Sequence, residues 1–289
     1  MSLASAIKSR ITGEAMACLQ YSLRRKEKDV LREAGLKYFF GGSKAAEDLL
    51  SSSLSKFKKN NYYDCAGIKF AAPEKDDYLL VYRELRDILY EHIYMAGNDC
   101  PYYYEGPYEY KEISLNAGDV VIDAGANIGM FSALASYKGA SVFSFEPIPQ
   151  NQKLLELTRS LNKNITVCPF ALSDKSGKMN LSMEEEGNIG SFMESKNAQN
   201  TFEVDCITLD EFAEKNNLEK VSFIKADIEG AERKMLTGAA EVLKTFAPKL
   251  AICTYHNPED PKLLEEIILK ANPRYKIYHR WKKLYGFVA

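Results

Sequence analysis

The stretch VVIDAGANIGMFSALAS, residues 120–136, decides the fold of this chain. Apolar residues run into Asp123, Gly125 and Gly129 then frame a short turn, and an apolar run with helical spacing follows. This order is typical of a strand, a tight turn and a helix whose turn lies against a ligand, because glycine tolerates positive φ and lets the backbone approach closely. The same two glycines are also compatible with tight packing alone.

The spacing within the turn argues against two common phosphate-binding loops. A triphosphate loop needs a lysine after its last glycine, but Gly129 is followed by Met130. The dinucleotide fingerprint needs glycines at its first, third and sixth places, where this chain has Gly125, Asn127 and Met130. Glu146 ends the next predicted strand, 21 residues after Gly125, and an acid there can accept both ribose hydroxyls of a nucleoside. The pattern favours a nucleoside cofactor without phosphate, a description that S-adenosylmethionine fits.

Strand-like and helix-like runs alternate from residue 119 onward, which predicts an α/β fold with a mostly parallel sheet and helices on both faces. The runs at 275–281 and 284–289 lie too close together for a crossover helix, so they must form an antiparallel hairpin at the end of the chain. The other predicted strands of this sheet cover 119–125, 140–147, 165–172, 221–228 and 249–256. Short strands are also predicted at 177–183 and 201–207.

The preceding residues, 1–107, are predicted to be a mainly helical segment, and 108–289 a catalytic domain. Apolar residues at helical spacing predict helices within 1–60 and over 78–97, with a strand at 66–72 between them. Such helices should bury an apolar face, either over the cleft as a cover for the acceptor or against another subunit in a homodimer. The cover is favoured, because a tyrosine-rich loop joins this segment directly to the first strand of the sheet.

Composition limits the classes of partner. The net charge is −2, so the chain lacks the basic excess of a general nucleic-acid binder. Its apolar runs are all shorter than the roughly 18 residues of a membrane span, so no membrane partner is expected. The six cysteines are scattered without a CxxC motif, which predicts reduced, mostly buried thiols in a cytoplasmic protein.

Five motifs occur in one order between Tyr108 and His256: GDVVIDAGANIGMFS, FSFEP, FALSD, ITLDEF and IKADIEGAE. This set resembles the FkbM-type S-adenosylmethionine-dependent methyltransferases, and its most specific part is IKADIEGAE combined with DAGANIG. The resemblance implies the Rossmann-like seven-stranded methyltransferase sheet, with S-adenosylmethionine as the cofactor. It also implies that the acceptor is a hydroxyl group of a sugar or another small metabolite.

The resemblance further implies which residues hold each part of the cofactor. The methionine part would lie against Asp123, Gly125, Asn127 and Gly129, the ribose against Glu146, and the adenine between Pro147 with Ile148 and Ala171 with Leu172.

The chemistry needs a group that removes a proton, because an alcohol loses its proton as it attacks the methyl carbon. Asp227, Glu229 and His256 follow predicted strands at the sheet edge where ligands bind, and they are the predicted catalytic residues. The two acids could instead start the next helix, and the histidine could be an ordinary loop residue. All three could hold a divalent metal, but spacing alone does not define coordination geometry, and no metal is predicted. Tyr108 is predicted to contact the acceptor, although tyrosine also suits a buried ring with a wet hydroxyl.

Two other functions remain open at this point. The first is an NAD-dependent oxidoreductase on a Rossmann-like fold, against which the missing third glycine and the closing hairpin argue. The second is a non-catalytic binding protein on a methyltransferase fold, since a fold does not guarantee an activity.

Overall fold

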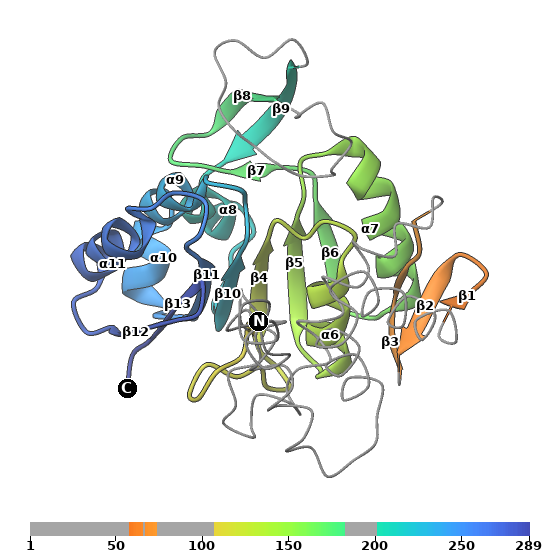
Figure 1. The fold of residues 1–289 in the computed structure, drawn as a ribbon, viewed down its shortest axis with the longest axis horizontal. Coiled ribbons are helices and arrows are strands. Elements are labelled where there is room, and N and C mark those ends of the chain that lie inside the picture. The colour runs from red at the N-terminus through yellow and green to blue at the C-terminus, as the bar shows by residue number, and fades with distance from the viewer. Residues whose placement is uncertain (1–57, 66, 74–106, 183–200) are drawn as a thin grey trace, which may run out of the picture. The chain divides into compact units, whose positions relative to one another are not determined.

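The computed structural model describes residues 58–65, 67–73, 107–182 and 201–289, and its centre is a seven-stranded sheet (Figure 1). The strands follow the order β12-β13-β11-β10-β4-β5-β6. Their bounds are β4 Val120–Ala124, β5 Ser141–Phe145, β6 Ile165–Cys168, β10 Phe223–Ala226, β11 Lys249–Cys253, β12 Lys276–Arg280 and β13 Lys283–Phe287.

The direction of the strands confirms the predicted fold class. β4 pairs in parallel with β5 and β10, and β6 and β11 continue the parallel ladder on either side. β13 runs antiparallel to both β11 and β12, as the short connection between the last two strands predicted. The chain winds from β4 toward β6 on one side and from β10 toward β11 on the other. The carboxyl ends of β4 and β10 therefore form the switch point where ligands bind in open α/β sheets.

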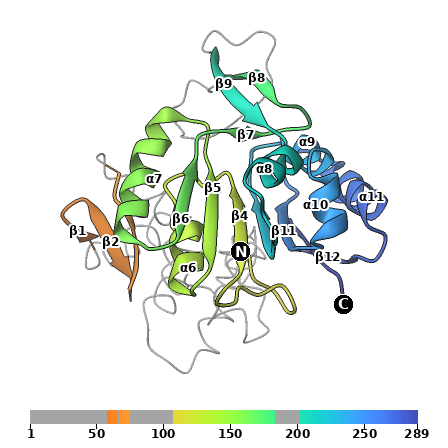
Figure 2. The same ribbon diagram turned by 180° about the vertical axis from the view of Figure 1, so that it is seen from behind.

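Six helices connect these strands in the described part of the chain, and Figures 1 and 2 show α6 and α7 near β5 and β6, with α8 to α11 near β10 to β13. Their bounds are α6 Met130–Tyr137, α7 Pro149–Leu161, α8 Leu209–Lys215, α9 Glu232–Thr237, α10 Ala240–Thr245 and α11 Asp260–Ala271.

The sheet is buried on both faces. Adjacent side chains along a strand point to opposite sides of the sheet, and helices pack on each side. On one face the ring of Phe223 in β10 lies 5.9 Å from Phe131 in α6. On the other face the ring of Phe145 in β5 lies 4.7 Å from Phe212 in α8, edge to face. All four side chains are buried. Packing against helices on both sides explains why the strands read as nearly continuous apolar runs.

A second, three-stranded sheet lies beyond the carboxyl end of β6, with the order β7-β9-β8 (Figures 1 and 2). Its strands are β7 Ala171–Leu172, β8 Gly177–Ser182 and β9 Thr201–Ile207, and β8 and β9 confirm the short strands predicted here. The single strand predicted over 165–172 is wrong, because that stretch divides into β6 of the large sheet and β7 of this one. Pro169 lies between them, and proline has no amide to donate to a strand ladder. α8 then follows the N-cap residue Thr208, whose side chain accepts a hydrogen bond from the Glu211 amide at 3.1 Å. This N-cap satisfies one of the free amides of the first helical turn.

The segment before Tyr108 is described only in part. Strand β3, Ile68–Ala71, confirms the strand predicted there, and it pairs with β2, Tyr62–Cys65. This hairpin belongs to the same compact unit as residues 108–289, and the Ala71 amide donates to Thr158 of α7 at 2.9 Å. The predicted helix over 1–60 is wrong at its end, where Lys58–Lys59 form the short strand β1.

The other helices predicted before Tyr108 lie outside the described residues, so the division into two domains at 107/108 stays a prediction. Cys168, Cys206 and Cys253 are buried free thiols, as predicted. Across the described ranges, none of the helices has the length and apolar character that a membrane span requires.

Candidate active site

The turn after β4 owes its glycines to contacts within the protein. Gly125 has a φ of 74°, and a Cβ atom there would lie 2.0 Å from the backbone carbonyl oxygen of Asp227. A Cβ atom at Gly129, φ 88°, would lie 2.6 Å from Leu155 and 2.9 Å from Thr158 in α7. These close approaches favour the packing explanation of the glycine pair over space reserved for a ligand.

Glu146 lies at the carboxyl end of β5, and it connects two loops of the sheet edge. Its side chain is 2% exposed. One carboxylate oxygen accepts from the Asn127 amide at 2.8 Å, and the other accepts from the Ile148 amide at 3.0 Å. Burial raises the pKa of Glu146 to about 7, although both backbone amides favour the ionised form. The structure therefore brings Glu146, Asn127 and Ile148 together.

An apolar pocket opens beside this carboxylate. Four of the predicted cofactor residues line it: Gly125, Pro147, Ala171 and Leu172. The sequence analysis missed the other lining residues, which are Ala124, Phe145, Phe170, Met179, Leu181, Ile228 and Ala231. Strand β8 contributes Met179 and Leu181, and no local pattern in the sequence connects this strand to the turn after β4. Ile148 is buried and forms the start of α7 instead of lining the pocket.

Asp123 and Asn127 differ in the partners that the protein offers their side chains. Asp123 is fully buried, 3.0 Å from the Lys225 ammonium, and accepts from Ser132 at 2.6 Å. Lys225 also donates to the Gly125 carbonyl at 2.7 Å, so the buried ion pair of Asp123 and Lys225 stabilises the backbone of the turn. The Asn127 side-chain oxygen is buried and has no hydrogen-bond partner among the described residues. Asp123 Oδ1 also has no hydrogen-bond partner among the described residues, but the Lys225 ammonium lies 3.0 Å from it. Of the two, Asn127 is therefore the candidate for contact with a ligand.

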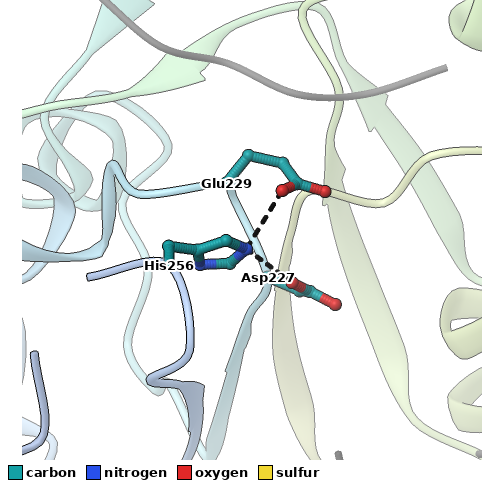
Figure 3. A group of neighbouring side chains, drawn as sticks. All are labelled: Asp227, Glu229 and His256. Carbon is teal, nitrogen blue, oxygen red and sulfur yellow. Dashed lines mark ion pairs between the residues drawn. The ribbon is translucent and has the colours of Figure 1, made fainter. Parts of the chain in front are cut away.

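The three predicted catalytic residues come together at the ends of β10 and β11 (Figure 3). His256 Nε2 lies 3.0 Å from Glu229 Oε2 and 3.8 Å from Asp227 Oδ1. Asp227 and Glu229 follow β10, and His256 follows β11, the neighbouring parallel strand. The side chains of Glu229, Asp227 and His256 are 35%, 18% and 9% exposed.

Burial and neighbouring charges shift the pKa of each group in this cluster differently. Burial would raise the pKa of Asp227, but Lys225 and Lys283 outweigh it and hold that pKa below its usual value. Burial raises the pKa of Glu229. Burial would lower the pKa of His256, but its close carboxylates Glu229 and Glu232 outweigh burial and raise it to about 10. His256 therefore carries a proton at neutral pH when the cluster holds only these side chains.

Three neighbours of the cluster were missed from the sequence. Glu232 is fully buried, 3.1 Å from His256 Nδ1, and accepts from the Ile228 and Gly230 amides at 2.9 and 3.0 Å. Tyr255 donates to Asp227 Oδ1 at 3.0 Å. Lys283 comes from β13, the antiparallel strand beside β11. Glu232 does stand in the motif IKADIEGAE, and Tyr255 precedes His256, so their proximity in sequence was a usable signal.

Tyr108 belongs to the same cluster, but as a buried residue. Its hydroxyl donates to Asp227 Oδ2 at 2.9 Å, and its ring is 5.2 Å from Phe131. The Lys283 ammonium lies 4.4 Å from the centre of the same ring. The tyrosine is 6% exposed, so its ring packs inside the protein while its hydroxyl holds Asp227.

Comparisons with known proteins found a matching family, curated relatives and a solved structure. Residues 123–275 match the methyltransferase FkbM domain. The chain is 28% identical over 154 residues to the hexuronic acid methyltransferase AglP of Haloferax volcanii, covering 53% of this chain and 62% of that protein. It is also 28% identical over 142 residues to methyltransferase 1 of Beauveria bassiana, covering 41% of this chain and 57% of that protein.

Each match thus spans about three fifths of the relative's length. A solved structure, methyltransferase FkbM from Methylobacillus flagellatus, aligns with a TM-score of 0.48 at 21% identity, over 86% of this chain and 60% of the other. The domain match covers more than half of the 289 residues, from the end of the first sheet strand to the last helix connection. This chain belongs to the FkbM methyltransferase family.

Proposed function

We propose that this chain transfers a methyl group from S-adenosylmethionine to a hydroxyl group of a sugar or another small metabolite. The observation that carries the proposal is the pairing of two sites at one sheet edge. A buried glutamate beside an apolar pocket ends β5, and an acidic cluster with a histidine ends β10 and β11. Membership of the FkbM family supports the same reaction class.

The residues present fit S-adenosylmethionine. Glu146 offers a carboxylate whose oxygens each have a free lone pair for the two ribose hydroxyls. The apolar pocket lined by Pro147, Ala171 and Leu172 suits the flat face of adenine. Asn127 Oδ1, buried without a hydrogen-bond partner in the described part of the chain, suits the ammonium of the methionine part. When bound, the cofactor supplies a methyl group activated by its sulfonium.

The protein then has to position the acceptor oxygen and take up its proton. Glu229 is the best candidate for the proton, because burial raises its pKa and its side chain is the most exposed of the three. Asp227 stays ionised and accepts hydrogen bonds from Tyr108 and Tyr255, so it orients the site. When the cluster holds only these side chains, His256 carries its own proton and serves as a donor, in contrast to the general base considered from the sequence.

The choice of a sugar acceptor has two supports. One curated relative is named as a hexuronic acid methyltransferase. The cluster also presents carboxylates and tyrosine hydroxyls, which are the groups that hydrogen-bond sugar hydroxyls. We also propose that the segment before residue 108 serves as a cover for the acceptor, the placement favoured from the sequence over assembly of a homodimer.

A transfer assay tests the proposal directly. The full chain would be incubated with S-adenosylmethionine labelled at its methyl group and with a neutral hexose, a hexuronic acid or an aliphatic alcohol. We expect labelled methyl on an oxygen of a sugar, located by NMR of the product. Binding of NADH without binding of S-adenosylhomocysteine would instead favour an oxidoreductase. Tight binding of S-adenosylhomocysteine without transfer to any acceptor would favour a non-catalytic binding protein.

A further inference from the structure

Asp227, Glu229 and His256 each place one potential metal-ligand atom within 4.8 Å of the other two (Figure 3). We propose that these three side chains bind a divalent first-row metal ion such as Mn²⁺. The set contains two carboxylates and one imidazole, a mixture that suits first-row transition metals better than the oxygen-seeking Mg²⁺ and Ca²⁺. Binding of the ion depends only on this geometry, whereas its effect on an acceptor rests on the proposed function.

One distance within the cluster already fits two ligands that share one ion, and a second is close to it. Metal–ligand bonds of about 2.1 Å separate neighbouring octahedral ligands by about 3 Å. His256 Nε2 and Glu229 Oε2 lie 3.0 Å apart. Asp227 Oδ1 lies 3.8 Å from the same nitrogen and would have to move by somewhat less than 1 Å.

The histidine is oriented as metal-binding histidines are. Its Nδ1 lies 3.1 Å from Glu232, and this leaves Nε2 directed at Asp227 and Glu229. Glu232 is itself held by two backbone amides, so the ring orientation is supported by the loop between β10 and α9. A carboxylate behind the imidazole is an arrangement common at metal sites.

The aspartate also has outer partners. Tyr108 and Tyr255 donate to separate oxygens of Asp227 at 2.9 and 3.0 Å, and each oxygen keeps a lone pair for an ion. These contacts hold the carboxylate in one orientation without using up its ligand capacity.

Independent support comes from the nitrogen atoms of His256. The side chain is 9% exposed, and both ring nitrogens are buried with no hydrogen bond of acceptable geometry to any described residue. The carboxylates of Glu229 and Glu232 thus lie within ion-pair distance of the ring nitrogens but are poorly aligned as hydrogen-bond acceptors. A buried ring nitrogen aimed at two carboxylates without a proper hydrogen bond is explained by an ion between them.

A second histidine provides the contrast. His279 Nε2 lies 2.6 Å from Glu265 Oε2, and both side chains are 39% exposed. This pair is a simple ion pair on the surface, so its residues offer matched controls for the cluster.

Electron paramagnetic resonance of Mn²⁺ tests the proposal without cofactor or acceptor, because bound Mn²⁺ loses the sharp signal of the free ion. The full chain would be purified, freed of metal with a chelator and titrated with Mn²⁺. The variants Glu229→Gln, His256→Gln, Glu265→Gln and His279→Gln would be titrated in the same way. We expect one Mn²⁺ per chain, at least tenfold weaker binding in the first two variants, and unchanged binding in the last two. Zn²⁺ should displace the Mn²⁺, and Ca²⁺ should not.

Thermal unfolding would confirm that each variant folds, and Glu229→Gln is the safer variant because its side chain is 35% exposed. Absence of stoichiometric Mn²⁺ binding by the folded chain would overturn the inference, as would equal affinity in Glu229→Gln and the wild type. Methyl transfer by a chain that binds no metal would leave the proposed function intact. Metal binding by a chain that transfers no methyl group would leave this inference intact and remove the function.

Discussion

The two halves of the sheet edge present different kinds of side chain. At the ends of β4 and β5, one buried carboxylate and backbone amides lie beside an apolar pocket. At the ends of β10 and β11, three carboxylates and a histidine gather within ion-pair distance. The first half suits a ligand with an aromatic base and a ribose, and the second suits a polar acceptor or an ion. A methyltransferase needs both at once, because the methyl donor and the methyl acceptor must meet at the switch point.

The two halves also shift the pKa of their acids in opposite directions. Burial raises the pKa of Glu146 to about 7, although two backbone amides, Asn151 and Lys225 favour its ionised form. Asp227 is also largely shielded, but Lys225 and Lys283 hold its pKa below the usual value. Burial and Lys225 act on both acids, and the further cations Lys283 and His256 beside Asp227 accompany its lowered pKa.

The largest effect is expected at Gly125, where the two halves touch. Gly125→Ala places a Cβ atom 2.0 Å from the Asp227 carbonyl oxygen, and φ is 74°. Overpacking and left-handed strain together should lower the free energy of unfolding by about 3 kcal/mol or more. Gly118→Ala is the matched control, since φ is also positive there but the space around it is open. Chemical denaturation would measure both, and equal losses would contradict the packing explanation.

The cofactor half is tested next by Glu146→Gln. The amide keeps the size of the side chain but replaces a charged acceptor of the ribose hydroxyls. Affinity for S-adenosylhomocysteine should fall by about 2 kcal/mol, roughly 30-fold, measured by calorimetry. Glu156→Gln on the exposed face of α7 serves as the control. Unchanged affinity in a folded Glu146→Gln protein would remove this residue from the cofactor site.

The acceptor half is tested by Tyr108→Phe, which deletes the donor to Asp227 Oδ2. Loss of one hydrogen bond to a carboxylate should reduce kcat/KM for the acceptor by about tenfold, with little change in the affinity for S-adenosylhomocysteine. Tyr278→Phe on β12 is a suitable control variant. If the affinity for S-adenosylhomocysteine fell by the same factor as kcat/KM, the two halves would not be separable.

The smallest effect concerns pH. Glu146 has a pKa raised from 4.5 to about 7, and only its ionised form is a full acceptor for the ribose. Affinity for S-adenosylhomocysteine should therefore rise by about threefold between pH 6.5 and 7.5, and the rise should be absent in Glu146→Gln. The same raised pKa means that the folded chain holds this proton longer than the unfolded chain. The contribution of Glu146 to the free energy of unfolding consequently falls as pH rises from about 4.5 through about 7. A flat affinity profile in the wild type would contradict this assignment.

Local patterns sufficed for much of the fold. The strand, turn and helix around residues 120–136 and the closing hairpin depend on side-chain spacing and connection length within short windows. Glu146 could be located as well, because its position at a strand end follows from the same local pattern. The reason for Gly125 could not, since the atom it avoids belongs to Asp227, 102 residues later in the chain.

The sequence by itself determined the fold class, the family and the three residues Asp227, Glu229 and His256 as a candidate group. Only the tertiary structure decided that they meet, because β10 and β11 are neighbours in parallel and deliver both loops to one edge. It also decided which partners they have: Glu232 behind His256, and Lys283 beside Asp227 from the antiparallel strand β13. Electrostatic environment depends on distances between residues far apart in the chain, and spacing along a sequence does not contain those distances.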